Sequence, residues 1–217
     1  MSFSFKIDSD FIKSDDCQYI IDHYSNKLKK SSVIGNSDLR NSDDFYVDFD
    51  NLDDEKSLKI FSDLKNKISN VSQLPIENQE LLTIIRYKEG EEFKPHLDAF
   101  HNYNDFEIES ILGGQRIWTF IICLKEANLG GETTFNKINE SIKLKKTECV
   151  YWKNVDNNGL VLENSEHSGK PPLSGEKWIL TCWVREKKYY PLNRDVVKDI
   201  INKYSKEILI NTLSNLK

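Results

Sequence analysis

The sequence predicts a mainly β fold with helices packed outside it, in the form of a sandwich or barrel of short strands. Two observations lead to this prediction. From residue 81 onward, apolar residues alternate with polar ones in short runs separated by turns that contain Gly or Asn. Before residue 75 and after residue 193, the apolar residues instead recur at helical spacing. The 217 residues are enough for one domain with a substantial core.

Two helices are expected in the N-terminal part, about residues 1–75. Residues 14–28 have helical spacing behind Ser14, which is expected to be the N-cap. Residues 53–71 repeat the pattern, and their apolar stripe consists of Leu58, Phe61, Leu64 and Ile68. The stretch between the helices, residues 31–50, is expected to be a loop that leads into a short strand.

Four strands are expected in the barrel part, about residues 80–187. They cover residues 81–88, 116–125, 148–155 and 177–184. In the last strand, Lys177, Thr181 and Trp183 share one face, while Trp178 and Cys182 point the other way. Residues 98–115 are expected to be a loop. A C-terminal amphipathic helix over about residues 193–216 follows Pro191 and either packs on the barrel or mediates a homodimer.

Composition excludes several classes of protein. The net charge is −5 with well-mixed charges, which argues against a nucleic-acid partner. No apolar run approaches the roughly 18 residues of a membrane span, and the N-terminus lacks the features of a signal peptide. Four cysteines without CxxC spacing are expected to be reduced and mostly buried; they are Cys17, Cys123, Cys149 and Cys182. Together these features predict a cytoplasmic protein without a membrane partner.

The stretch "RYKEGEEFKPHLDAF", residues 86–100, contains His96 and Asp98 two positions apart. In a strand, such residues point to one face and can reach one cavity. The pair alone is weak evidence, because ordinary polar residues at a strand end give the same pattern. Among the four histidines, His167 is the one distant enough to complete a 2-His-1-carboxylate set, which holds iron(II) and leaves three positions open.

Lys177 begins an apolar strand ten residues after His167. A buried lysine is costly unless an anion meets it, so Lys177 is a candidate anchor for the far carboxylate of an α-keto acid. The alternative is a lysine at a strand edge whose ammonium reaches solvent.

The chain resembles the prolyl 4-hydroxylases of the iron(II)- and 2-oxoglutarate-dependent dioxygenase superfamily over roughly residues 9–186. The resemblance lies in "PIENQELLTIIRYKEGEEFKPHLDAF", "GGQRIWTFIICL", "GGETTF" and "HSGKPPLSGEKW", which follow one another in the family's order. It implies a double-stranded β-helix, a jelly-roll core, in a single dioxygenase domain over residues 1–217.

The resemblance also implies roles for individual residues. His96, Asp98 and His167 would hold iron, and Lys177 would bind the distal carboxylate of 2-oxoglutarate. Tyr87 and Thr119 would line the cosubstrate pocket, while Arg116 and Trp183 would face the substrate. Gly130 and Gly131 are expected to be structural. No side chain beyond the metal ligands is expected to act as a catalytic group.

The chain departs from the family at two places. Phe93 stands where many relatives have a tyrosine, which removes a hydroxyl near the substrate. After His167, the chain reads Ser-Gly-Lys-Pro instead of Ala-Gly-Cys-Pro.

The expected reaction is 4-hydroxylation of prolyl residues in a peptide or protein, with iron(II), 2-oxoglutarate, dioxygen and ascorbate as cofactors. Two alternatives remain open: a dioxygenase of the superfamily that acts on another amino acid or a small molecule, and a barrel that binds metal or peptide without turnover.

Overall fold

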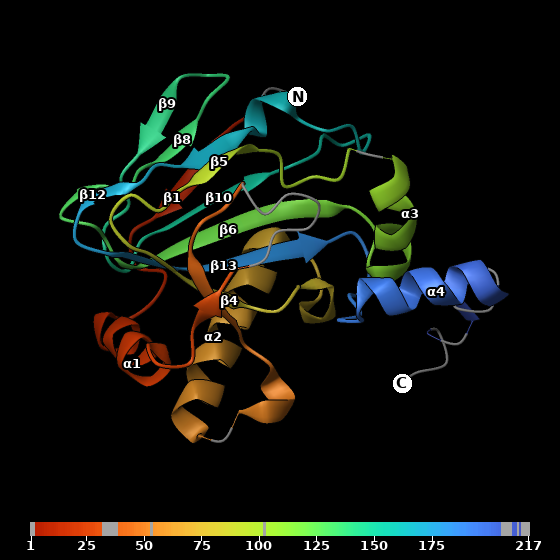
Figure 1. Ribbon diagram of the computed structural model, residues 1–217, viewed down its shortest axis with the longest axis horizontal. Coiled ribbons are helices and arrows are strands. Elements are labelled where there is room, and N and C mark those ends of the chain that lie inside the picture. Colours follow the sequence, from red (N-terminus) through yellow and green to blue (C-terminus); the bar gives the residue numbers. More distant parts are fainter. Residues whose placement is uncertain are drawn as a thin grey trace.

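Two antiparallel β-sheets packed face to face form the centre of the fold (Figure 1). This computed structural model describes residues 3–31, 39–52, 54–101, 103–204, 210, 211 and 213. The large sheet has seven strands in the spatial order β1 (Phe5–Asp8), β10 (Cys149–Lys153), β6 (Arg116–Lys125), β13 (Lys177–Arg185), β4 (Thr83–Tyr87), β3 (Asp43–Tyr46) and β2 (Lys29–Lys30).

The small sheet has four strands in the spatial order β5 (Phe93–His96), β11 (His167–Gly169), β8 (Thr133–Phe135) and β9 (Glu140–Ile142). A separate strand pair joins β7 (Leu129–Gly130) to β12 (Pro172–Ser174). Gly130 has φ +73°, and a Cβ there would lie 2.6 Å from the Pro171 carbonyl oxygen. This contact explains the structural role expected for that glycine.

The apolar interior lies on both faces of the large sheet. Between the two sheets, one cluster joins Phe135 of β8 to residues of the large sheet such as Ile121, Trp152 and Ile179. On the other face, α1 (Ser14–Tyr24) and α2 (Glu55–Ser72) cover a second cluster that includes Trp178 and Cys182. The alternation predicted for β13 is therefore confirmed, since Ile179 and Trp178 belong to opposite faces.

These facing sheets confirm the predicted mainly β, jelly-roll fold with helices outside. All four predicted strands are present, as β4, β6, β10 and β13. The four cysteines are unpaired and buried. Among the described residues, no helix combines the length and apolarity that crossing a membrane needs.

Three local predictions are wrong. Ser14 is the first helical residue rather than the N-cap, which is Lys13. Leu58 is 46% exposed, because Ile60 and Phe61 take the inward face of α2. The stretch expected to be a loop before β6 contains a helix, α3 (Tyr103–Leu112).

The C-terminal helix is present as α4 (Arg194–Tyr204). It lies beside α3 at one end of the sheets (Figure 1). Val197 is fully buried in a cluster with Ile111, Leu112 and Leu213. The end of the predicted helix lies partly outside the described residues. Within the described residues, short helical turns also occur at Phe49–Asn51, Ile76–Asn78 and Glu163–Ser165.

Candidate functional site

The pairing of β5 with β11 brings two distant histidines together. His96 is the last residue of β5, and it lies directly opposite His167, the first residue of β11. Their ring centroids are 4.3 Å apart. Asp98 lies in a bend just beyond β5, so it reaches the same place from past the strand end rather than from within the strand.

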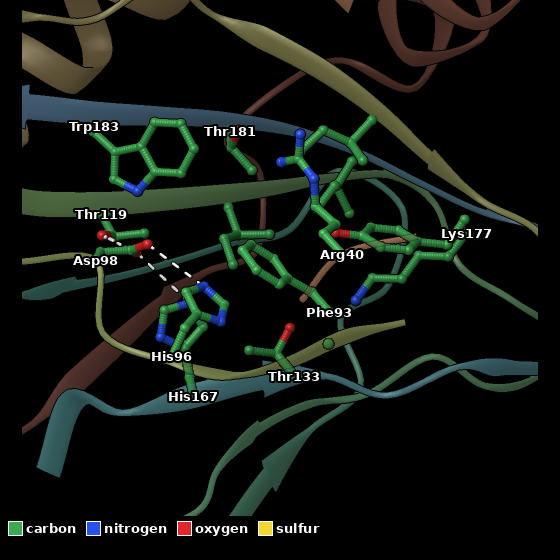
Figure 2. Close-up of a pocket in the computed structure, with 15 residues that line it drawn as sticks. Arg40, Phe93, His96, Asp98, Thr119, Thr133, His167, Lys177, Thr181 and Trp183 are labelled. Atoms are coloured by element: carbon green, nitrogen blue, oxygen red, sulfur yellow. Dashed lines mark hydrogen bonds and ion pairs between the residues drawn. The ribbon is translucent and has the colours of Figure 1, made fainter. Parts of the chain in front are cut away.

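The three side chains converge as a 2-His-1-carboxylate set (Figure 2). His96 Nε2 is 3.6 Å from Asp98 Oδ1, and His167 Nε2 is 3.6 Å from Asp98 Oδ2. One ligand atom from each residue can be chosen so that all three lie within 4.8 Å of one another. This arrangement brings together all three residues expected from the sequence.

The hydrogen bonds behind the histidines prepare them to bind a metal ion. Nδ1 of His96 donates to the Lys94 carbonyl at 2.8 Å, and Nδ1 of His167 donates to the Ser165 carbonyl at 3.0 Å. A carbonyl oxygen only accepts, so Nδ1 carries a proton in both rings, and Nε2 is the ring nitrogen left for a metal ion. Both Nε2 atoms face the Asp98 carboxylate.

Protonation states agree with this donor set. Burial, together with the neighbouring His96, lowers the pKa of His167 to about 4, so this ring is neutral at pH 7. Burial acts to raise the pKa of Asp98, but His167, His96 and Arg116 outweigh it and hold that pKa well below its usual range. A carboxylate and neutral imidazoles are the ligands of a facial iron(II) site, so these residues fit the metal that the sequence predicts.

A pocket of about 450 Å³ of unfilled space, part of it open to solvent, extends from the three ligands into the space between the sheets. It is lined by Arg40, Ile85, Tyr87, Phe93, His96, Asp98, Thr119, Ile121, Thr133, His167, Gly169, Lys177, Ile179, Thr181 and Trp183. Every predicted site residue except Arg116 is in this lining.

Lys177 lies across the pocket from the three ligands (Figure 2). Lys177 is only 6% exposed. Within the described residues, its ammonium makes no hydrogen bond and no ion pair. Burial lowers the pKa of Lys177 to about 8. Tyr87 lies directly opposite Lys177 on the neighbouring strand. Burial raises the pKa of Tyr87 to about 12, so its hydroxyl stays protonated and can donate to an anion beside the ammonium.

The pocket wall also contains polar atoms without a partner. Thr181 Oγ1, Trp183 Nε1 and Arg40 Nε are buried and make no hydrogen bond within the described part of the chain. A buried polar atom left unpaired is costly, so these atoms indicate a wall built to receive polar groups of bound molecules.

Arg40 is a pocket residue that no pattern in the sequence predicts. It lies in the long connection before β3 and forms an isolated β-bridge with Phe93, which brings it to the pocket. Its Nη2 donates to Asp44 Oδ2 at 2.5 Å, and its guanidinium is 5.4 Å from the Phe93 ring centroid. No local pattern distinguishes this arginine, because its place depends on a strand fifty residues away along the chain.

A model of the 2OG-Fe(II) oxygenase superfamily matches residues 82–185, which include every ligand described above. Prolyl 4-hydroxylase 1 of Arabidopsis thaliana is 31% identical over 198 residues, which cover 82% of this chain and 67% of that protein. The chain belongs to the prolyl 4-hydroxylase family.

Other members of the prolyl 4-hydroxylase family extend this comparison. Probable prolyl 4-hydroxylase 7 of Arabidopsis thaliana is 29% identical over 204 residues, and the match covers 82% of this chain but only 61% of that relative. The viral collagen prolyl hydroxylase of Paramecium Bursaria Chlorella virus-1, solved with 2OG, has a TM-score of 0.65 at 22% identity and covers 83% of this chain and 95% of that one. A Trichoplax adhaerens prolyl hydroxylase, solved with a hypoxia inducible factor peptide, has a TM-score of 0.60 at 13% identity and covers 84% and 83%. The two structures support the jelly-roll fold.

Thr119 has a different contact from the one that the family resemblance implies. Its hydroxyl donates to Asp98 Oδ2 at 2.6 Å, so it supports the carboxylate ligand directly (Figure 2). Contact between Thr119 and the cosubstrate stays a prediction.

Arg116 lies outside the pocket lining, next to Trp183, which belongs to it. Its Nε and Nη2 donate to the two oxygens of Glu80 at 2.6 and 2.8 Å, and its guanidinium is 4.0 Å from the Trp183 ring centroid. Glu80 also accepts from Arg185 at 2.9 Å. Arg116 is thus part of a buried ion network, and its contact with a peptide stays a prediction.

Phe93 and Trp183 both line the pocket, as expected. Phe93 stacks on His96, with ring centroids 3.6 Å apart and planes 16° apart. In this family member, an aromatic ring without a hydroxyl therefore covers one face of His96.

Proposed function

We propose that this protein is an iron(II)- and 2-oxoglutarate-dependent dioxygenase that 4-hydroxylates prolyl residues in a peptide or protein. The names of the relatives in the prolyl 4-hydroxylase family support this choice of substrate. The chain spans 61% and 67% of the lengths of these two relatives, so their substrates are carried over as part of the proposal.

One observation supports the reaction class above all others. A 2-His-1-carboxylate set and a buried lysine without a partner among the described residues line the same pocket. The set matches iron(II), and the lysine matches an anion held at the other end of the pocket. Lys177 would bind the distal carboxylate of a dicarboxylate such as 2-oxoglutarate, while the metal site would take its keto acid end.

The proposed net reaction consumes 2-oxoglutarate, dioxygen and a C–H bond of the substrate. 2-Oxoglutarate loses CO2 and becomes succinate, one oxygen atom of dioxygen enters succinate, and the other enters a C–H bond of the substrate as a hydroxyl group. Iron(II) and dioxygen supply this oxidising chemistry when they are bound. His96, Asp98 and His167 would hold the metal, while Tyr87 and Lys177 would orient the cosubstrate and Lys177 would offset its charge.

The substrate would contact Arg40, Phe93 and Trp183, which all line the pocket. Trp183 Nε1 and Arg40 Nε are buried donors without a partner among the described residues, and peptide carbonyls are matching acceptors. Phe93 offers an apolar surface against which a proline ring can pack. Arg116 would help by holding Trp183 in place and through any contact of its remaining nitrogen with the peptide.

Two further expectations belong to this proposal. A cytoplasmic location follows from the reduced cysteines expected in the sequence, and fractionation of host cells tests it. A homodimer through α4 rests on the exposed Val196, at 54%, beside the buried Val197. Sedimentation velocity measures whether the chain is a monomer or a dimer.

The decisive experiment measures hydroxylation and succinate together. Purified protein with iron(II), 2-oxoglutarate and ascorbate is incubated with proline-rich peptides, and tandem mass spectrometry locates any added oxygen. Amino-acid analysis distinguishes 4-hydroxyproline from 3-hydroxyproline. The matched controls are the same peptides with alanine for proline and the His167→Ala protein.

Each outcome has a separate meaning. Oxygen on proline C4, with an equal amount of succinate, supports the proposal. Oxygen on another residue or on a free small molecule would show that the substrate is not a prolyl residue, while the protein would still be a dioxygenase. No succinate under any condition, with iron bound, would identify a barrel that binds without turnover.

A further inference from the structure

A chain of buried hydrogen bonds leads from the core to the carboxylate ligand. Trp152 Nε1 donates to Asn154 Oδ1 at 2.9 Å, and Asn154 Nδ2 donates to Thr119 Oγ1 at 2.9 Å. The Thr119 hydroxyl then donates to Asp98 Oδ2 at 2.6 Å. None of these four residues is more than 5% exposed.

The ends of this chain fix the direction of every proton in it. An indole N–H can only donate, and an ionised carboxylate can only accept. Trp152 therefore sets the oxygen of the Asn154 amide toward itself and its NH2 group toward Thr119. Because the threonine oxygen already accepts from Asn154, its own proton remains for Asp98. The flipped form of the Asn154 amide would place its NH2 group against the indole N–H, where two donors would face each other. The hydrogen-bond partners therefore fix the orientation of the amide.

The backbone holds Asn154 in place for this role. The residue follows β10, where its N–H donates to the Ile117 carbonyl at 2.9 Å and its carbonyl accepts from Leu162 at 2.9 Å. Trp152 and Thr119 lie directly opposite each other in the pairing of β10 with β6. Trp152 and Thr119 are therefore held by the large sheet and Asn154 directly follows it, whereas Asp98 lies in a bend outside any strand.

Trp152 also contacts a second ligand. Its ring meets the His167 ring edge-on, with centroids 4.7 Å apart and planes 71° apart. One side chain thus packs against a histidine ligand and begins the hydrogen-bond chain to the carboxylate ligand. These two ligands come from segments that are far apart in the sequence.

We propose that Asn154 and Trp152 are positioning residues of the metal site. They keep the Thr119 hydroxyl as a donor to one oxygen of Asp98, so that the carboxylate offers its other oxygen to the metal. Asn154 acts through Thr119 alone. The inference rests on the metal site of the proposed function but not on the choice of substrate.

The expected size of the effect follows from the role of hydrogen bonds behind metal ligands. Losing such a bond typically weakens metal binding about 10–100-fold. Without Asn154, the Thr119 hydroxyl can rotate away from Asp98. Without the hydroxyl, both oxygens of the carboxylate are free, and the bend after β5 loses the bond that holds it.

The test measures metal affinity directly, by calorimetric titration of the metal-free protein with Co(II) in the absence of 2-oxoglutarate. Three variants are compared with the wild type in this titration. Thr119→Val removes the hydroxyl at nearly constant shape, Asn154→Leu removes the amide, and the third variant combines both changes. Each single variant is expected to bind Co(II) about 10–100-fold more weakly. The double variant is expected to bind no more weakly than Thr119→Val alone, because Asn154 acts through the missing hydroxyl.

Two controls separate positioning from general stability. Thr119→Ser keeps the hydroxyl and is expected to restore metal affinity to within a few-fold of the wild type. Trp152→Phe removes the first donor, whereas Trp178→Phe removes a buried indole N–H that donates to Glu176 at 3.1 Å, away from the pocket. The first is expected to weaken Co(II) binding and the second to leave it unchanged. This pair also carries the test if Asn154→Leu does not fold.

The results that would overturn the inference are distinct from failure of the proposed function. If the wild type binds Co(II) but the losses of the two single variants multiply in the double variant, Asn154 does not act through Thr119. Equal losses in Trp152→Phe and Trp178→Phe would assign Trp152 to stability alone. If the wild type itself binds no Co(II) or iron(II), the metal site of the proposed function is wrong, and this inference is wrong with it.

Discussion

Substituting Lys177 by methionine is expected to change two properties in opposite directions. Methionine keeps the length and apolar stem of the side chain but removes the charge. The ligand-free protein should become more stable, because a buried ammonium without a partner among the described residues is removed. The same change should nearly abolish binding of 2-oxoglutarate, because the distal carboxylate then lies in the pocket unpaired.

The gain in stability and the loss of 2-oxoglutarate affinity are both expected to be several kcal/mol at most. Burial lowers the pKa of Lys177 from 10.5 to about 8, which at pH 7 corresponds to about 3 kcal/mol of destabilisation by the charged form. The unfolded chain binds the proton more tightly, so this penalty applies below pH 8 and disappears as the pH rises toward 10.5. Loss of one partner from a buried ion pair costs about 3–5 kcal/mol, which weakens 2-oxoglutarate binding by about two to almost four orders of magnitude.

Two measurements check this prediction. Urea unfolding of the metal-free protein gives the change in stability, and calorimetry on the Mn(II)-loaded protein gives the affinity for 2-oxoglutarate. 2-Oxovalerate, which has the same chain length without the distal carboxylate, is the matched ligand. Lys137→Met is the matched protein control, because Lys137 pairs with Glu163 outside the pocket.

The outcome for the two ligands decides the reasoning. The wild type should prefer 2-oxoglutarate strongly over 2-oxovalerate, whereas Lys177→Met should bind 2-oxoglutarate no more tightly than 2-oxovalerate. An unchanged preference in Lys177→Met would show that the distal carboxylate is held elsewhere. A fall in stability without a change in affinity would assign Lys177 to the fold.

The three metal ligands, the titration of Lys177, Arg116 and Phe93 give four further predictions. Alanine in place of any one of the three metal ligands should abolish turnover while circular dichroism shows an intact fold, and substantial activity in any of them contradicts the site. Affinity for 2-oxoglutarate should fall about tenfold per pH unit above about 8, as Lys177 loses its proton, and a flat affinity up to about pH 9.5 contradicts its role. Arg116→Ala should cost about 3 kcal/mol of stability, because buried Glu80 loses a bidentate partner, and should weaken peptide hydroxylation more than uncoupled decarboxylation of 2-oxoglutarate. Equal loss of both activities would show that Arg116 supports the metal site or the cosubstrate pocket instead of the peptide site. Phe93→Tyr should be tolerated and should strengthen prolyl-peptide turnover, measured as hydroxyproline formed per succinate; a weaker coupling would show that the site depends on the apolar ring.

The sequence by itself predicted the candidate ligands and the architecture that brings them together. His96 and Asp98 are close along the chain, and few histidines are available to join them, so composition narrowed the choice to His167. The alternation of β13 separated Lys177 and Trp183 from Trp178 before any contact was known, because strand geometry alone fixes which residues share a face. The ordered motifs of the family then identified the jelly-roll fold.

The tertiary structure decided the contacts between segments that are distant in sequence. Arg40 reaches the pocket through a bridge to Phe93, Arg116 is held by Glu80, and Thr119 donates to Asp98. Hydrogen bonds of this kind depend on strand register and on the position of a bend to within an ångström, which no periodicity in a single sequence records. The sequence predicted the chemistry of the candidate site, and the packing of the two sheets decided which side chains surround that site.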